Sequence, residues 1–461
     1  MKIHTGEFRI LSTSGILGYG FPEESFRRAI RRKPHIIGID AGSTDPGPYY
    51  LGSGKSFTNR LFVKRDLRLI LAAATRLGIP VVIGSAGGAG ARPHLDWCRD
   101  IIYEVARENR LSFKMGVIAT DISAGRVLRS LRAGDIQPLP FVPKLTPGAV
   151  RECSHIVAQV GVEPIIKALD RGCQIVLCGR CYDPAVFAAL PIAMGYDPGL
   201  AMHMGKILEC AAIAATPGSG ADCAMGILNK DSFVLECPNP LRKFTRMSTA
   251  AHTLYEKSDP CHLPGPGGTI NLENCSFTEV PGGRVEVRGS RFEKTPHYWI
   301  KLEGARRIGF RAVSIAGVRD PVMITQIDKI LPAVRAQVLK LSHASNSGGR
   351  IIFHIYGKDG VMGALEPERR PGAHELGIII EALGNTQEDA DMLCSLTRST
   401  LLHYGYPGRI STAGNLAMLF SPSDIGMDAV YEFTVYHLMK IHDPAGFPLA
   451  VERISGGRRL S

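Results

Sequence analysis

Glycine-rich stretches follow several short apolar runs in this sequence, and charged side chains are concentrated in them. These stretches are DAGSTDPGPYYLGSGKS at 40–56, GSAGGAGARPHLDW at 84–97 and GRCYDPA at 179–185. Glycine lets a backbone approach a ligand closely or adopt a positive φ. We therefore expect the three stretches to bind an anionic substrate, and the candidate binding residues are Asp40, Ser43, Asp45, Lys55, Gly87, Gly88, Arg92 and Arg180.

Acid–base chemistry beside a bound anion needs a side chain that can hold and release a proton. His94 directly follows a glycine-rich stretch, where it could transfer protons or simply cap the next helix together with Asp96. His203 shares a predicted helix face with Lys206 and Cys210, and that face could serve acid–base or thioester chemistry or be buried in the core. The candidate catalytic residues are His94, Asp96, Asp183 and His203.

Cofactor motifs are present only in fragments. GSGKS lacks the first glycine of a phosphate-binding loop, because Tyr49 occupies that position. If Gly88 is the first glycine of the dinucleotide-binding motif G-x-G-x-x-G, the position of the third glycine is occupied by Pro93, so the motif is incomplete. The cysteines at 173, 178 and 181 have ferredoxin-like spacing, but Cys173 and Cys178 bracket an extended apolar run and would face opposite sides of a strand. We predict no metal and no redox cofactor, and coenzyme A is expected only as part of a substrate.

The pair His252 and Glu256 leaves one alternative open. Their i, i+4 spacing places them on one helix face, where they could ligate a metal, orient a base or form an ordinary surface pair. No H-E-x-x-H sequence or paired C-x₂-C motif indicates a catalytic zinc.

Composition limits the class of protein further. The 461 residues carry 54 Lys and Arg against 43 Asp and Glu, a net charge of +11 that fits either a basic surface or an anionic substrate. No recognition motif indicates nucleic acid, and no apolar run is long enough for a membrane span. The 11 cysteines and the absence of an export signal predict reduced thiols in a soluble, cytoplasmic protein.

The first half of the chain alternates apolar runs with amphipathic stretches. The runs at 8–13, 35–41, 79–85, 113–119 and 173–179 are apolar on both faces, which is typical of buried parallel strands. Intervening stretches such as 66–77 and 96–108 read as helices. This order predicts an α/β fold in which a parallel sheet carries helices on both faces. Ligands of such sheets bind beyond the carboxyl ends of the strands. We therefore expect the three glycine-rich stretches to meet at one edge of the sheet, where one cavity should be lined by Asp40, Ser43, Asp45, Gly87, Arg92 and Asp183.

The end of the chain has a different pattern. Strand-like runs at 350–357, 375–383 and 429–438, with a helical stretch at 386–405, give a β-β-α-β order. We therefore predict an α/β domain at 1–345 and a smaller C-terminal α+β domain at 346–461, joined through a small polar linker at 343–349. The basic tail ISGGRRLS is expected to be loose.

Several long stretches resemble the acyclic terpene utilisation protein A family. They include ILSTSGILGYGFPEESF, GIDAGSTDPGPYYLGSGKSF, HMGKILECAA, AAHTLYEK and GRISTAGNLA, and the resemblance runs from about Phe8 to about Pro448. It implies a role in the breakdown of branched terpenes through acyl-CoA intermediates. It supplies no catalytic set, and the chain departs from the family pattern at Cys178 and Cys181.

Two classes of function are compatible with these observations. The first is a catabolic enzyme of hydro-lyase type, which adds or removes water on a branched or polycarboxylic acid or its coenzyme A thioester. The second is a non-catalytic ligand-binding or scaffold subunit of an acyl-CoA carboxylase or hydratase system. A homo-oligomer or a complex with a small partner subunit is compatible with either.

Overall fold

The computed structural model describes residues 6–342, 349–368, 372–410 and 412–460. Its contacts divide the chain into two units, Met1–Arg306 with Phe433–Ser461, and Arg307–Glu432. The boundary expected between 345 and 346, and nearly all of the linker predicted at 343–349, lie outside the described residues. The division of the described chain instead falls within two long strands, β15 (Tyr298–Val318) and β19 (Asp424–Ile441).

The first unit is built on a large sheet that is parallel at its centre. The five predicted strands are confirmed, and they adjoin in the order β1-β2-β3-β7-β4. Their β-branched residues fill both faces of the sheet, since a central strand has no exposed side. Their bounds are β1 (Phe8–Ser12), β2 (Ile36–Asp40), β3 (Val81–Gly84), β7 (Ile175–Cys178) and β4 (Phe113–Ile118).

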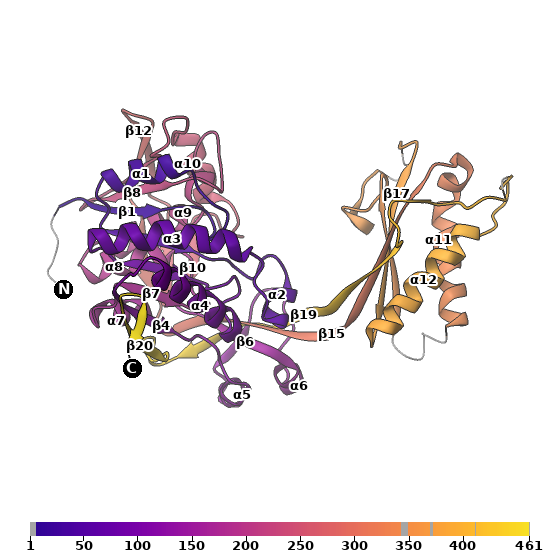
Figure 1. Ribbon diagram of the computed structural model, residues 1–461, viewed down its shortest axis with the longest axis horizontal. Helices are drawn as coiled ribbons and strands as arrows, with labels where there is room; N and C mark the ends of the chain where they lie inside the picture. The colour runs from indigo at the N-terminus through magenta and orange to yellow at the C-terminus, as the bar shows by residue number, and fades with distance from the viewer. Residues whose placement is uncertain (1–5, 343–348, 369–371, 411, 461) are drawn as a thin grey trace. The chain divides into compact units, whose positions relative to one another are not determined.

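Helices cover both faces of this sheet, as predicted. Val81 and Ile83 point into one apolar cluster and Val82 into another, because successive strand residues face opposite sides. Helices α1 (Glu23–Arg31), α3 (Arg60–Leu77) and α4 (Arg92–Glu108) contribute to the first cluster and are seen in front of the sheet in Figure 1. The second cluster holds α5 (Ala124–Arg132), α7 (Glu163–Asp170), α8 (Ala185–Ala193) and α9 (Pro198–Leu208).

Antiparallel strands extend the sheet at both edges, so it is mixed rather than purely parallel. On one side the order is β1-β8-β9-β13-β12, and on the other it is β4-β20-β21. The tail expected to be loose instead contains the end of β20 and all of β21, which pair with each other, and β20 also pairs with β4. The bounds are β8 (Ala224–Leu228), β9 (Phe233–Glu236), β12 (Ser276–Val280), β13 (Arg284–Arg288), β20 (Leu449–Ser455) and β21 (Arg458–Leu460).

Smaller elements complete the first unit. Strands β10 (His262–Gly265), β11 (Gly268–Asn271) and β14 (Arg291–Lys294) form a separate antiparallel sheet. β6 (Cys153–Gln159) pairs with the first part of β15, and β5 (Ile136–Pro138) with the last part of β19. The short helices are α2 (Pro48–Ser53), α6 (Pro147–Arg151), α10 (Arg246–Leu254) and the 3₁₀ turn at Ala211–Ala214.

Between residues 350 and 441 the described elements follow the predicted β-β-α-β order, with the short strand β18 (Ala417–Met418) before the last strand, β19. The second unit also includes part of β15 and α11 (Pro321–Leu341), which precede that segment. β17 (Leu376–Gly384) pairs with β16 (Arg350–Tyr356) and with the second part of β15. Helices α11 and α12 (Gln387–His403) share one apolar cluster with the buried residues of this sheet, and β18 pairs with β15. The buried cluster draws all its residues from this unit, between Ala312 and Leu416.

Candidate functional site

The loops after β2, β3 and β7 meet at one edge of the parallel sheet. The Ala41 N–H donates to Gly84 O at 2.9 Å, and the Ser85 N–H donates to Gly179 O at 3.0 Å. The expectation that these loops share an edge is therefore confirmed.

A cavity of about 430 Å³ opens beside this edge, within the first unit. One part of its wall is charged, with side chains from the strand-end loops, α9 and β15. Another part is apolar and aromatic. The lining residues are Asp45, Leu139, Gln159, Arg180, Tyr182, Asp183, Lys206, Glu209, Glu256, Lys257, Pro264, Gly265, Pro266, Gly268, Thr269, Thr295, Trp299, Lys301, Tyr436 and Leu438.

Arg180 is the centre of the charged wall. Its buried guanidinium donates from Nε to Glu303 at 2.8 Å and from Nη1 to Asp183 at 3.0 Å and Ser85 Oγ at 2.9 Å. Lys301 lies 2.7 Å from Glu303, so one carboxylate separates two cations. Burial alone would raise the pKa of Glu303, but the charges of Arg180 and Lys301 outweigh it and lower that pKa to about 2. Glu303 therefore stays ionised and holds both cations in place.

Two aspartates beside Arg180 have raised pKa values. Asp40, at the end of β2, is buried and accepts a hydrogen bond from the Gly42 N–H at 3.2 Å. Its burial raises its pKa, and the nearby charge of Asp183 raises it further. Burial also raises the pKa of Asp183, although Arg180 opposes the shift. Asp183 is therefore a stronger base than an ordinary aspartate while remaining paired with a cation.

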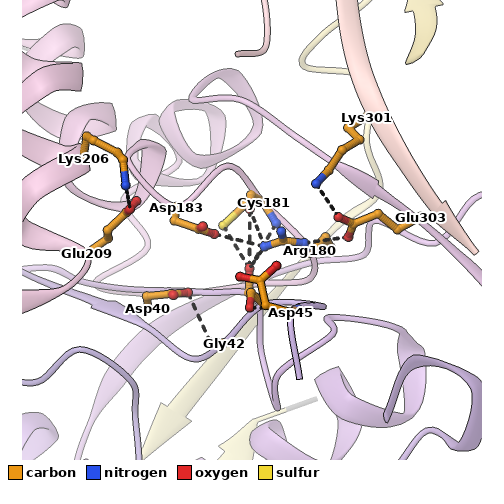
Figure 2. A network of polar contacts seen from close by, with 12 residues as sticks. Asp40, Gly42, Asp45, Arg180, Cys181, Asp183, Lys206, Glu209, Lys301 and Glu303 are labelled. Carbon is orange, nitrogen blue, oxygen red and sulfur yellow. Dashed lines mark hydrogen bonds and ion pairs between the residues drawn. The ribbon is translucent and has the colours of Figure 1, made fainter. Parts of the chain in front are cut away.

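A second ion cluster lies on α9. Figure 2 shows the Lys206–Glu209 pair on the opposite side of Asp183 from Glu303 and Lys301. The Lys206 ammonium is buried and lies 2.7 Å from both Glu209 and Glu256. Burial would lower its pKa, but the two carboxylates raise it, so Lys206 remains charged.

The two carboxyl partners of Lys206 differ in protonation. Burial and the charge of Asp183 raise the pKa of Glu209 to about 8, against the pull of Lys206. Burial also raises that of the more exposed Glu256, but Lys206 outweighs it and lowers the pKa overall. Glu256 is thus the anionic partner, and Glu209 carries a proton near neutral pH. Its Oε2 atom is buried without a hydrogen-bond partner among the described residues.

The predicted site residues separate into two groups. Asp45, Arg180 and Asp183 line the cavity, and Figure 2 shows Asp40 near Asp45 and Asp183. The others do not line it: Ser43, Lys55, Gly87, Gly88, Arg92, His94, Asp96 and His203. The single cavity expected to hold Asp40, Ser43, Asp45, Gly87, Arg92 and Asp183 is therefore lined by only part of that set.

The stretch 84–91 packs against protein. A Cβ added at Gly87 would lie 2.8 Å from the Cβ of His94, and one at Gly88 would lie 2.6 Å from the ring of Phe57. Both glycines have positive φ, at 62° and 109°. The glycines predicted to contact substrate thus allow neighbouring loops to pack closely.

Arg92 and its neighbours form a surface network. Arg92 Nε donates to Asp96 at 3.0 Å, its N–H donates to Asp121 at 2.9 Å, and Arg99 also pairs with Asp96. Lys55 Nζ donates to the Tyr49 hydroxyl at 3.1 Å. The Ser43 hydroxyl accepts from the backbone N–H two residues later. These contacts can fix the loops without any ligand.

Both candidate histidines are buried and neutral. His94 has Nε2 3.1 Å from Lys55 O, and burial lowers its pKa to about 4. His203 lies between the hydroxyls of Ser290 at 2.7 Å and Thr253 at 3.0 Å, and burial lowers its pKa to about 3. His203 is therefore bonded within the core, which agrees with the alternative that its helix face is buried.

Several lining residues were not selected from the sequence. Lys206 and Glu256 were considered only as parts of helical stripes, and Tyr182, Glu209 and Lys301 were not considered. Glu303, which does not line the cavity but binds Arg180 and Lys301, was not considered either. The spacing within two pairs could have indicated side chains on a common face. Lys206 and Glu209 are at i, i+3 on a helix, and Lys301 and Glu303 are at i, i+2 on a strand. Nothing in the sequence indicated that these pairs meet.

A family model matches part of the chain. Residues 53–225 match the model described as acyclic terpene utilisation family protein AtuA. The expected family resemblance is confirmed over this segment. It contains Arg180, Asp183, Lys206 and Glu209, whereas Glu256, Lys301 and Glu303 lie beyond it. Searches of curated proteins and of solved structures found no match.

Across 6–342, 349–368, 372–410 and 412–460, no cluster of three or more His, Cys, Asp or Glu side chains could hold a metal ion. Within the same ranges, none of the helices combines the length and the apolar character needed to cross a membrane.

Proposed function

We propose that this chain is a hydro-lyase that adds water to, or removes it from, a branched unsaturated organic acid or its acyl thioester. The observation that carries the proposal is the pairing of two carboxyl groups in one cavity. Glu209 holds a proton near neutral pH, and Asp183 lies beside the Arg180 guanidinium. One acid and one base in a common cavity are what such a reaction requires.

The reaction can be written with these two groups. Asp183 removes a proton from water, and the water oxygen forms a bond to the β-carbon of the unsaturated acyl group. The electron pair of the carbon–carbon double bond shifts toward the carbonyl. Glu209 then delivers its proton to the α-carbon. The reverse sequence removes water, and the two carboxyl groups exchange roles.

The rest of the wall suits an acyl group. Arg180 and Lys301 present positive charge on one side, and Trp299, Pro264 and Leu438 provide an apolar surface. The cavity volume of about 430 Å³ lies within the range of about 300–1,000 Å³ typical of small-molecule sites. It suits a short branched acyl chain, so a coenzyme A moiety would extend beyond it. The link of the matched family to acyclic terpenes, whose skeletons are branched and unsaturated, supports this substrate class.

A direct test is incubation of the purified chain with dimethylacrylate, dimethylacryloyl-CoA and longer branched homologues, followed by mass spectrometry. Gain of one water by a substrate, or its loss from the hydroxy acid, would support the proposal. Saturable binding with no mass change would favour the non-catalytic ligand-binding subunit. Failure of every compound to bind would overturn both.

A further inference from the structure

Tyr182 belongs to the loop after β7 and lies between the charged residues Arg180 and Asp183 in the sequence. Its backbone N–H donates to Val160 O at 2.8 Å, which anchors the loop to β6 and its extension. Its ring packs on β10, where a Cβ added at Gly265 would lie only 2.7 Å from the ring. The side chain is 6% exposed. The backbone of Tyr182 is therefore anchored, and its buried ring packs closely against β10.

The hydroxyl of Tyr182 is buried without a hydrogen-bond partner among the described residues. Buried polar atoms are rarely left in this state, so such an atom in a cavity wall calls for a ligand or an ordered water. Burial raises the pKa of Tyr182, and the charges of Glu209 and Asp183 add to the effect. The phenol therefore keeps its proton near neutral pH.

Three other polar side chains of the wall, those of Tyr436, Thr295 and Lys206, are already engaged. The Tyr436 hydroxyl accepts from Lys301 at 3.2 Å, and the Thr295 hydroxyl donates to His297 O at 2.7 Å. Lys206 donates to its two glutamates. Tyr182 is thus a fixed, neutral donor whose oxygen lies among the side chains that the proposed reaction uses.

We propose that Tyr182 is a further catalytic residue, which donates its phenolic hydrogen to the carbonyl oxygen of the bound acyl group. This assignment rests on the proposed function. When water adds to the β-carbon, electron density moves to that oxygen until the α-carbon is protonated. A donor held in place before the reaction stabilises the developing negative charge without reorganising. The ligand class is thereby narrowed to acyl groups with a carbonyl conjugated to the double bond.

The test compares the wild type with Tyr182→Phe, which removes only the hydroxyl. The matched control is Tyr196→Phe, because that hydroxyl donates to Gly6 O and its residue is not part of the cavity wall. Dimethylacryloyl-CoA, isotopically labelled at the carbonyl carbon, is the probe. Infrared difference spectroscopy measures the carbonyl stretch of the bound probe, and calorimetry measures its Kd.

We expect the bound carbonyl stretch to fall in frequency in the wild type and in Tyr196→Phe, and to return toward its solution value in Tyr182→Phe. The Kd should change by less than about tenfold, while kcat should fall about 10²–10³-fold, as for loss of one oxyanion donor. A Tyr182→Phe protein that keeps both the shifted stretch and kcat would overturn the assignment of Tyr182 alone. A wild type that does not bind the probe would overturn the proposed function and this assignment with it.

Discussion

Glu209 and Glu256 contact the same cation, the Lys206 ammonium, but differ in protonation state. Both lie 2.7 Å from the Lys206 ammonium. Glu209 is buried and near Asp183, so its pKa rises to about 8, whereas the pKa of Glu256 is lowered. Burial and a neighbouring negative charge thus make Glu209 the acid of the proposed reaction.

This assignment predicts the direction of the pH dependence. Because Glu209 must be protonated to donate, kcat for water addition should fall as the pH rises through about 8. The measurement is a pH–rate profile of the wild type and of Glu209→Gln. The variant should be slower and should lack the decline near pH 8. A decline of equal steepness in the variant would show that another group causes it.

The Glu303 carboxylate should matter more for stability than any surface ion pair. Glu303→Gln removes the buried carboxylate that Arg180 and Lys301 share and leaves Arg180 with Asp183 alone, so we expect a loss of about 3–5 kcal/mol in the free energy of unfolding. Glu23→Gln removes an exposed pair with Arg27 and should cost no more than about 1 kcal/mol. Urea denaturation measures both, and equal losses would contradict this view of the network.

The same carboxylate sets a pH window. Its pKa is depressed to about 2 in the folded protein, below the value of about 4.3 expected in the unfolded chain. Its contribution is therefore present above about 4.3 and is lost as the pH falls toward about 2. Acid denaturation of the wild type should show this loss, and Glu303→Gln should not.

At the scale of elements, α9 positions the acid. Asp197 caps this helix by accepting a hydrogen bond from the Leu200 N–H at 2.9 Å, and Glu209 immediately follows the last turn. Asp197→Ala should lower the free energy of unfolding by about 0.5–2 kcal/mol, while Asp197→Asn keeps a side-chain acceptor and should change it little. Thermal melts of the two variants test this. Equal melting temperatures would show that the cap does not stabilise α9.

The parallel strands were predictable because each is a short apolar run bounded by glycine or polar residues. The antiparallel edge strands β8, β9 and β20 were not, since their pairing depends on contacts distant in sequence. Because parallel strands end at the same edge of a sheet, the position of the site was predictable. The placement of Asp45, Arg180 and Asp183 at this edge was predictable for the same reason. Glycine at 87 and 88 indicated a close approach but not whether the neighbour is ligand or protein. Lys301, from a distant strand, could not be placed at all.

At the scale of the whole molecule, Arg307–Glu432 has a core of its own. A chain limited to residues 307–432 should therefore fold cooperatively when expressed alone. Dispersed amide resonances and a single thermal transition would confirm this. A fragment without a cooperative transition would show that its sheet needs the parts of β15 and β19 that lie in the first unit.

The central claim is that turnover takes place in the cavity of the first unit, with Asp183 and Glu209 as base and acid. The most direct measurement is kcat for water addition to dimethylacryloyl-CoA by four folded variants. Asp183→Asn and Glu209→Gln should each lose at least about 10²-fold, the usual contribution of a positioned acid or base. Arg92→Lys and His94→Gln, which alter the network outside this cavity, should stay within about tenfold of the wild type once their folded fractions are matched. The reverse pattern, with His94→Gln inactive and Glu209→Gln active, would contradict the account.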